Sequence, residues 1–154
     1  MSRAERAKQY FMQGYACSQA VALAFADLMG MEEEVIAKIT LPFGGGLGRL
    51  RLTCGALSGM ATVIGMVFSK AENTPENKLA TYAIVQQLCE KFKQENGSFL
   101  CGELLEGAKV KTEVGGAAEP RTESYYKKRP CSELVYQTAE ILEKYLIEQG
   151  KLDD

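Results

Sequence analysis

The stretch from Thr53 to Ser69 constrains the fold more than any other part of the sequence, because it is apolar almost all round. A helix without a polar face must be covered on every side, either by lipid or by the rest of the protein. This stretch is shorter than the ~20 residues that span a bilayer, and it contains Ser58 and Thr62. We therefore predict a buried helix from about Cys54 to Phe68 in the middle of the fold.

Two of the three glycines in this helix are expected to allow close packing. The helix carries Gly55, Gly59 and Gly65, and each glycine in a helix costs about 1 kcal/mol relative to alanine. Gly55 and Gly59 are one turn apart and therefore share a face. We expect this face to allow a neighbouring backbone or a bound group to approach closely.

The remaining sequence also favours helices, since it has no strand-like alternation of useful length and no internal repeat. We expect a single all-α domain over residues 1–154, a bundle of about five to six helices with a short tail at 151–154. Six helices are expected, from the N-terminus to about residue 13 and then over 17–30, 32–39, 54–68, 75–96 and 132–149, and a further short stretch of helix is expected after 101.

Local signals support several of these helices. Ser2 and Glu5 have the spacing of a capping box, and Thr74-Pro75 is an N-cap followed by proline at the first helical position. In the helix over 75–96, apolar residues spaced by three or four predict a buried stripe. Its members are Leu79, Tyr82, Val85, Cys89 and Phe92. We also interpret Met60, Met66 and Tyr82 as core residues.

Two segments interrupt the helices. Residues 41–48 are rich in glycine and predict a tight loop. Because this loop lacks the Lys-Ser/Thr of a P-loop and follows no strand, we favour a structural turn that delivers Cys54 to its site over an anion-binding loop. Residues 107–130, which contain Gly115-Gly116, predict a long loop or gate with a turn of helix around 123–128. Residues 125–129 are interpreted as a solvated loop end.

The composition excludes several classes of chemistry, above all because the sequence has no histidine. Ser-His and Cys-His nucleophile pairs and Cys₂His₂ zinc sites are therefore excluded. With 18 basic and 20 acidic residues the formal charge is −2, so we expect no nucleic-acid partner. Carboxylates occur only in surface-like runs, which gives hydrolase chemistry no support.

The N-terminal region does not fit a secretory signal, although basic residues precede an apolar run. Glu5 interrupts the basic region, and the apolar run over 20–26 is short and ends at Asp27. We therefore expect a cytoplasmic protein without membrane insertion, whose thiols stay reduced. Its five cysteines then indicate metal ligands or redox groups rather than structural disulfides. A redox partner and a homo-oligomer are both compatible with the sequence, which identifies neither.

The cysteines divide into four and one. Cys89 lies on the apolar stripe of a helix and is interpreted as a core residue. The other four stand at, or in the first turn of, expected helices and are followed by small residues. Free amides and the positive end of the helix dipole stabilise a thiolate there, and the thiolate is both the nucleophile and the metal ligand. These candidate site residues are Cys17, Cys54, Cys101 and Cys131. They form no CxxC pair, so spacing alone does not bring them together.

Neighbouring charges suggest a ranking of these thiols. Arg49 and Arg51 precede Cys54, and 127–129 is a basic run before Cys131. Both should lower the pKa of the thiol that follows. Because Cys54 has no acidic residue nearby in the sequence, we expect Cys54 to be the most acidic thiol.

The segments around these cysteines resemble a family of redox-active proteins named for its cysteine signature, C_GCAxxG_C_C. The similar segments are 14–21 with Cys17, 43–46 followed by the CGAxxG block at 54–59, 101–105 with Cys101, and 131–135 with Cys131. The resemblance implies a small helical prokaryotic protein with four characteristic cysteines and a redox role. Some relatives are similar but carry selenocysteine at a cysteine position, and the cysteine domain of split-Soret cytochromes also looks related. This chain has no CxxCH motif, so no haem is expected. Some relatives have an acidic residue shortly before the central cysteine, where this chain has Leu52-Thr53.

Three functional hypotheses follow. In the first, two or more of the four cysteines cycle between thiol and disulfide, and an enzyme of this kind would be a thiol-dependent oxidoreductase. In the second, the four cysteines bind an iron–sulfur cluster or zinc. In the third, the chain is a non-catalytic helical binding module with incidental cysteines.

Overall fold

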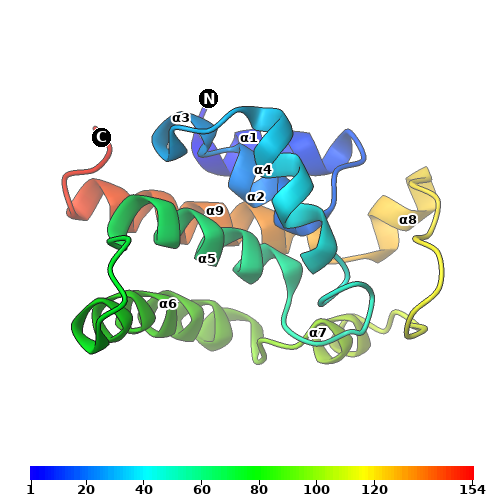
Figure 1. The fold of residues 1–154 in the computed structure, drawn as a ribbon. Helices are drawn as coiled ribbons and strands as arrows, with labels where there is room; N and C mark the ends of the chain where they lie inside the picture. Colours follow the sequence, from blue (N-terminus) through cyan, green and yellow to red (C-terminus); the bar gives the residue numbers. More distant parts are fainter.

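The computed structural model describes all residues from 1 to 154 as an all-α fold of nine α-helices and one 3₁₀ turn (Figure 1). The α-helices are α1 (Arg3–Met12), α2 (Cys17–Leu23), α3 (Ala26–Met29), α4 (Glu33–Thr40), α5 (Gly55–Phe68), α6 (Pro75–Asn96), α7 (Cys101–Gly107), α8 (Glu123–Lys128) and α9 (Cys131–Glu148). The 3₁₀ turn η1 covers Leu41–Phe43. The predicted all-α class is confirmed, whereas five to six helices was too low a number.

One reason for the larger number is a break at Phe25. The single helix expected over 17–30 is two helices, α2 and α3, because Phe25 leaves helical geometry at φ −119° and ψ 19°. The break leaves the Ala24 carbonyl without a helical donor, and the guanidinium of Arg3 donates to it at 3.0 Å. Arg3 also pairs with the carboxylate of Asp27 in α3. Arg3 therefore donates a hydrogen bond to the free carbonyl at the break and neutralises the carboxylate that follows it.

The predicted helix caps are present. The Ser2 hydroxyl accepts from the Glu5 amide at 3.1 Å, and the Glu5 carboxylate accepts from the Ser2 amide at 2.7 Å. Thr74 accepts from the Asn77 amide at 3.1 Å, so α6 begins at Pro75 as expected. The turn of helix expected around 123–128 is α8.

Helix α5 lies in the middle of the fold, between α6 on one side and α2 and α4 on the other, with α9 behind it (Figure 1). Its buried residues include Leu57, Met60 and Ile64, which confirms the predicted central helix and the interpretation of Met60 as core. No helix of the chain is both long and apolar enough to cross a membrane.

The two glycines of α5 that share a face have the role that their spacing predicted. A Cβ at Gly59 would collide with the Ser18 carbonyl oxygen and lie 3.1 Å from the Ser18 carbonyl carbon. A Cβ at Gly55 would lie 2.5 Å from the sulfur of Cys17. The absence of both side chains lets the first turn of α2 approach α5. Gly65 has no atom within 4 Å of its Cβ position and plays no such part.

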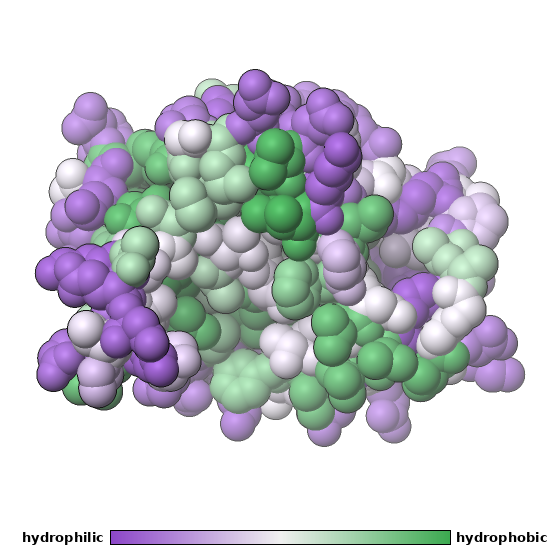
Figure 2. Space-filling view, in the orientation of Figure 1, coloured by the Kyte–Doolittle hydropathy of each residue, from purple (hydrophilic) through white to green (hydrophobic).

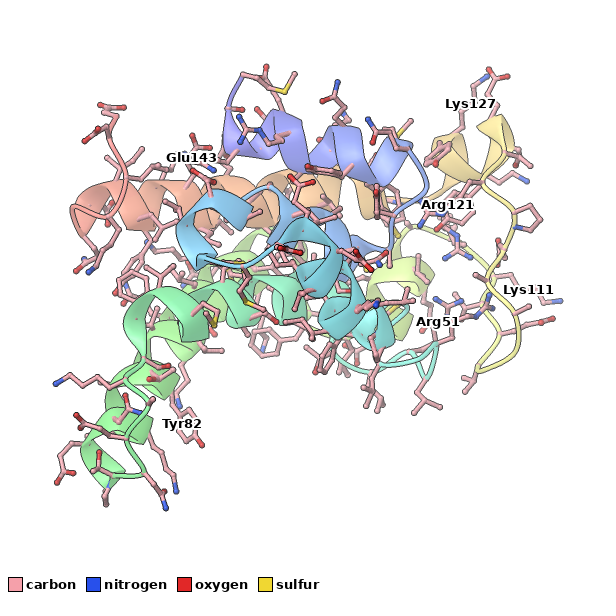
Figure 3. The ribbon with its side chains drawn as sticks, turned by 45° about the horizontal axis from the view of Figure 1, so that its top comes forward. Arg51, Tyr82, Lys111, Arg121, Lys127 and Glu143 are labelled. Atoms are coloured by element: carbon pink, nitrogen blue, oxygen red, sulfur yellow. The ribbon has the colours of Figure 1, made fainter.

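The apolar stripe of α6 is buried only towards its C-terminal end. Leu88 and Phe92 are buried, whereas Leu79 is 73% exposed and Tyr82 is 56% exposed. Met66 of α5 is also exposed, so interpreting Met66 and Tyr82 as core was wrong. The cause is length: at 1.5 Å per residue, the 22 residues of α6 extend well past the 14 residues of α5. Figure 3 shows the part of α6 with Tyr82 standing out from the other helices.

Candidate functional site

Four of the five cysteines line one cavity of about 320 Å³. Cys17, Cys101 and Cys131 are the first residues of α2, α7 and α9, and Cys54 is the N-cap of α5. The structure therefore brings together the cysteines that the sequence grouped, each at the start of a different helix. Cys89 is partly buried in α6 and does not line the cavity. All five cysteines are free thiols.

The glycine-rich loop between η1 and α5 positions two of these cysteines. The Cys54 amide donates to the Phe99 carbonyl at 2.8 Å, and the Cys101 amide donates to the Leu52 carbonyl at 2.6 Å. These bonds join the end of the loop to the start of α7 and place Cys54 beside Cys101. A Cβ at Gly46, whose φ is +73°, would lie 2.7 Å from the Cys101 Cβ. The loop is thus a structural turn that only glycine can complete at this position.

The same loop contains three non-glycine residues in the left-handed region, Leu47, Arg49 and Arg51, with φ of 68°, 64° and 61°. Each costs on the order of 1 kcal/mol or more for a residue with a side chain. Two of the three are arginines that line the cavity. Strain in this loop therefore accompanies the placement of charge beside the thiols.

On the outside of the molecule this loop exposes apolar side chains of its own. Leu47, Leu50 and Leu52 are each more than two-fifths exposed, and Leu100 beside them is 40% exposed. Figure 2 shows an apolar area at the lower right of the molecule, over the loop and α7. The wall of the cavity on this side is therefore polar inside and apolar outside.

Burial, rather than the helix starts, decides the pKa of three cavity thiols, Cys17, Cys54 and Cys131. Burial raises the pKa of Cys54 well above its ordinary value, and the neighbouring thiols Cys17, Cys101 and Cys131 raise this pKa further. Burial likewise raises the pKa of Cys17 and brings that of Cys131 to about 12. The opposing effect that the sequence predicted is also present: amides of Gly45 and Ser18 lower the pKa of Cys17. It is the smaller effect.

The expectation that Cys54 is the most acidic thiol was wrong. Arg51 contacts a different sulfur, since its Nη1 lies 3.6 Å from Cys101 Sγ. A hydrogen bond from the Ala56 amide lowers the pKa of Cys54, but burial raises this pKa by more. Arg129 does lower the pKa of Cys131, by its charge and by a hydrogen bond, but burial outweighs this effect as well.

The segment over 108–122 and α8 lies at the end of the molecule where α5, α7 and α9 begin (Figure 1). Arginines fasten it there. Arg49 donates to the Ala117 carbonyl, and Arg51 Nε donates to the Glu113 carbonyl at 3.1 Å. Arg129, whose side chain is 5% exposed, pairs with Glu119 at 2.5 Å. Segment 108–122 thus closes one side of the cavity through contacts with the residues that flank the cysteines.

Arg121 attaches the same segment to α1. It donates to the carbonyls of Phe11 and Tyr15, both at 2.9 Å, and its guanidinium lies 4.3 Å from the centre of the Phe11 ring. In Figure 3, Arg121 and Arg51 lie on the inner side of the segment, whereas Lys111 and Lys127 extend away from it. Tyr125 is half-buried and lines the cavity, so interpreting 125–129 as a solvated loop end was wrong for Tyr125 and for the buried Arg129.

Sequence reasoning identified the cysteines but missed Arg121, Glu119 and Tyr125 as cavity residues. They lie in a segment without periodicity, so no local signal pointed to them. The nearest available signal was the basic run before Cys131, of which Arg129 turns inwards.

The four thiols line a shared cavity without converging on a single point. No group of three or more cysteine, aspartate or glutamate side chains is arranged as ligands of a metal ion. A structural zinc site needs four ligands at about 2.0–2.3 Å from one ion. The thiols of this chain would have to move inwards to form such a site.

Comparison with known proteins gives a match that covers the segments that carry the four cavity cysteines. The sequence model of a family described as "Putative redox-active protein (C_GCAxxG_C_C)" matches residues 15–145, which contain all four cavity cysteines. Curated proteins and solved structures gave no match. The match covers most of the chain, from the residue before the N-cap of α2 to the last turns of α9, and the chain belongs to this family of redox-active C_GCAxxG_C_C proteins.

Proposed function

We propose that this protein is a thiol redox protein in which two or more of Cys17, Cys54, Cys101 and Cys131 cycle between thiol and disulfide. The observation that carries the proposal is that four free thiols, from four different helices, line one cavity. Thiol–disulfide exchange needs an attacking thiol, a resolving thiol and access for the substrate. A shared cavity supplies all three.

Cys101 is the best candidate for the attacking thiol. Its sulfur lies 3.6 Å from Nη1 of Arg51, a guanidinium donor. Reactive cysteines typically lie beside such a cation in a partly exposed position, and Cys101 is partly exposed. The three other cavity thiols have pKa values raised by burial, which suits resolving thiols that must stay protonated until the first step is complete.

The exchange would proceed in two steps. The Cys101 thiolate attacks one sulfur of a substrate disulfide, whose S–S bond breaks as the new S–S bond forms, and the departing thiolate takes up a proton. A second cavity thiol then loses its proton and attacks Cys101 of the mixed disulfide, which releases the second substrate thiol. Two cysteines are oxidised to a disulfide, and one substrate disulfide is reduced to two thiols.

A Cys₄ iron–sulfur or zinc site is the second candidate, favoured by the donor set itself: four soft sulfur ligands and no histidine around one cavity. Cys17, Cys54, Cys101 and Cys131 would be its ligands. A bound cluster would supply one-electron transfer, and a zinc ion would be structural. This candidate ranks second because no group of three or more of these side chains is arranged as metal ligands.

Metal analysis and visible absorption on protein purified without oxygen, followed by a thiol count on the same sample, separate the candidates. We expect no stoichiometric metal, and cavity thiols that disappear in pairs on mild oxidation. Cys89→Ser is the matched control, because Cys89 lies outside the cavity, and it should leave the paired loss unchanged. Stoichiometric iron with a charge-transfer band would replace thiol exchange by the cluster. Single Cys→Ser variants at the four positions that leave the redox titration unchanged would favour the binding module.

A further inference from the structure

The cavity has an excess of positive charge among its side chains. Four arginines line it, Arg49, Arg51, Arg121 and Arg129, together with a single carboxylate, Glu119. Glu119 pairs with Arg129. The other three guanidinium groups form no ion pair anywhere in the chain. This imbalance is local, because the chain as a whole carries a formal charge of −2.

The hydrogen-bond acceptors of these three arginines are backbone carbonyls, the Tyr126 hydroxyl and the Cys101 sulfur, and none is a carboxylate. Arg49 and Arg51 donate to backbone carbonyls of the segment over 108–122, and Arg121 donates to carbonyls of the α1 end. A guanidinium has five N–H donors, so these contacts use only part of the capacity. A carbonyl also does not neutralise the charge. The side chains are therefore held in place but remain electrostatically unmatched.

One donor is unmatched altogether. The Nε of Arg49 is buried and has no hydrogen-bond partner, and no other buried side-chain nitrogen or oxygen of the chain shares this condition. Leaving a buried donor unsatisfied costs about 1–3 kcal/mol, more for a charged group. Arg49 also adopts a left-handed backbone conformation to reach its position. Nε itself has no accessible surface, so a ligand would meet the rest of the Arg49 side chain, which lines the cavity and carries these two unfavourable features without a compensating carboxylate.

We propose that the cavity binds a small molecule with an oxyanion group, a carboxylate, phosphate or sulfonate, and that Arg49 and Arg51 are its principal ligands. Arg51 links this site to the cysteines, since the same guanidinium contacts Cys101 Sγ. Cavities lined by one sign of charge and by low-dielectric walls concentrate ligands of the opposite sign, and 13 of the 23 lining residues are hydrophobic. The cavity is also of ordinary size for a small ligand, at the lower end of the range of about 300–1,000 Å³.

The class of substrate rests on the proposed thiol function. The substrate is a small disulfide that carries an acidic group. Its carboxylate accepts from Arg49 and Arg51, and its S–S bond lies near Cys101. The exchange is the one described above: Cys101 and a resolving thiol are oxidised, and the acidic disulfide leaves as two acidic thiols. A fully structural role for the arginines, as fasteners of the segment over 108–122, is the competing explanation.

The test combines a binding arm and a reaction arm. In the binding arm, glutarate and sulfate, neither of which can oxidise a thiol, are titrated calorimetrically into the reduced full chain at constant ionic strength. In the reaction arm, the rate of thiol loss is measured with dithiodipropionate, hydroxyethyl disulfide and cystamine, which are small anionic, neutral and cationic disulfides. We expect saturable binding of glutarate or sulfate, and a rate with dithiodipropionate at least about tenfold above that of hydroxyethyl disulfide.

Variants assign the effect to the cavity. Arg49→Gln and Arg51→Lys should abolish saturable anion binding and remove most of the preference for dithiodipropionate over hydroxyethyl disulfide. Lys111→Gln is the matched control: it removes one positive charge from the segment over 108–122, which Arg49 and Arg51 contact, but Lys111 is exposed, outside the cavity and points away from it (Figure 3). It should change neither readout. If either arginine variant fails to fold, the two arms on the unmodified chain decide alone.

The two proposals fail in different ways. Absence of saturable glutarate and sulfate binding, with equal rates for the three disulfides, would overturn the oxyanion site and leave thiol exchange standing. Binding of glutarate or sulfate by a chain whose thiols resist all three disulfides would overturn thiol exchange and leave the oxyanion site standing. Binding that Lys111→Gln weakens as much as Arg49→Gln would show a diffuse charge effect and overturn the site.

Discussion

The close approach of α2 to α5 makes opposite predictions for two glycines of the same helix. Replacing Gly by Ala in a helix interior gains about 1 kcal/mol of stability from propensity alone. At Gly65 nothing lies within 4 Å of the new methyl group, so Gly65→Ala should raise the free energy of unfolding by up to about 1 kcal/mol.

At Gly59 the same methyl group meets backbone. It would collide with the Ser18 carbonyl oxygen and lie 3.1 and 3.2 Å from the Ser18 carbonyl carbon and Cα. These atoms cannot turn aside as a side chain can, so α2 must shift. Overpacking of this kind costs about 1–3 kcal/mol, which the propensity gain only partly offsets. Gly59→Ala should therefore lower the free energy of unfolding by up to about 2 kcal/mol.

Urea denaturation of the two variants and the unmodified chain, in reducing buffer, measures both values. The difference between the variants is the sharper quantity, because both share the propensity term. We expect Gly59→Ala to be the less stable by at least about 1 kcal/mol. Equal stabilisation by both substitutions would refute the argument, since it would mean that α2 does not approach α5 as closely as described.

Three further predictions concern the thiols and a helix cap. Above the ordinary thiol pKa of 9.0 the unfolded chain loses the Cys131 proton, whereas the folded chain keeps it up to about 12. The free energy of unfolding should therefore fall as the pH rises through this window, by up to about 1.4 kcal/mol per pH unit. Urea midpoints should fall less with pH for Cys131→Ser than for the unmodified chain, and an equal fall in the two proteins would contradict the burial of that thiol. Cys54 should react with iodoacetamide more slowly than Cys89 near neutral pH, because Cys54 is 6% exposed and its pKa is raised well above normal; peptide mass spectrometry that finds Cys54 the faster would count against this. Ser2→Ala should lower the free energy of unfolding by about 1 kcal/mol through loss of the capping box, and an unchanged urea midpoint would show that the cap is not formed in solution.

Features that depend on neighbours in the sequence could be predicted. The cap at Ser2, the start of α6 after Thr74 and the short helix α8 are each decided by contacts within a few residues. The position of four cysteines at helix starts could be predicted for the same reason. Their meeting in one cavity could not, because that depends on how α2, α5, α7 and α9 pack.

Features that depend on distant neighbours were the ones predicted wrongly. The stripe of α6 has the correct period at Leu79 and Tyr82, but no other helix reaches these residues to cover them. Arg51 is close to Cys54 in the sequence, yet its left-handed backbone directs the guanidinium to Cys101. Arg121 gave no signal at all, because its partners are carbonyls more than a hundred positions away.

The four cavity cysteines come from separate helices. A disulfide between any two of them would therefore close a long loop and stabilise the whole chain. Cys101 and Cys131 are 30 positions apart, and Cys17 and Cys131 are 114 apart. Closing loops of these sizes removes conformational entropy from the unfolded chain equivalent to about 3.6 and about 4.8 kcal/mol. By linkage the fold favours the oxidised pair by the same amounts, which correspond to reduction potentials lowered by about 80 and about 100 mV relative to the same pair in the unfolded chain. Oxidation in this cavity would thus stabilise the fold against unfolding. The fold would in turn make the disulfide harder to reduce than it is in the unfolded chain.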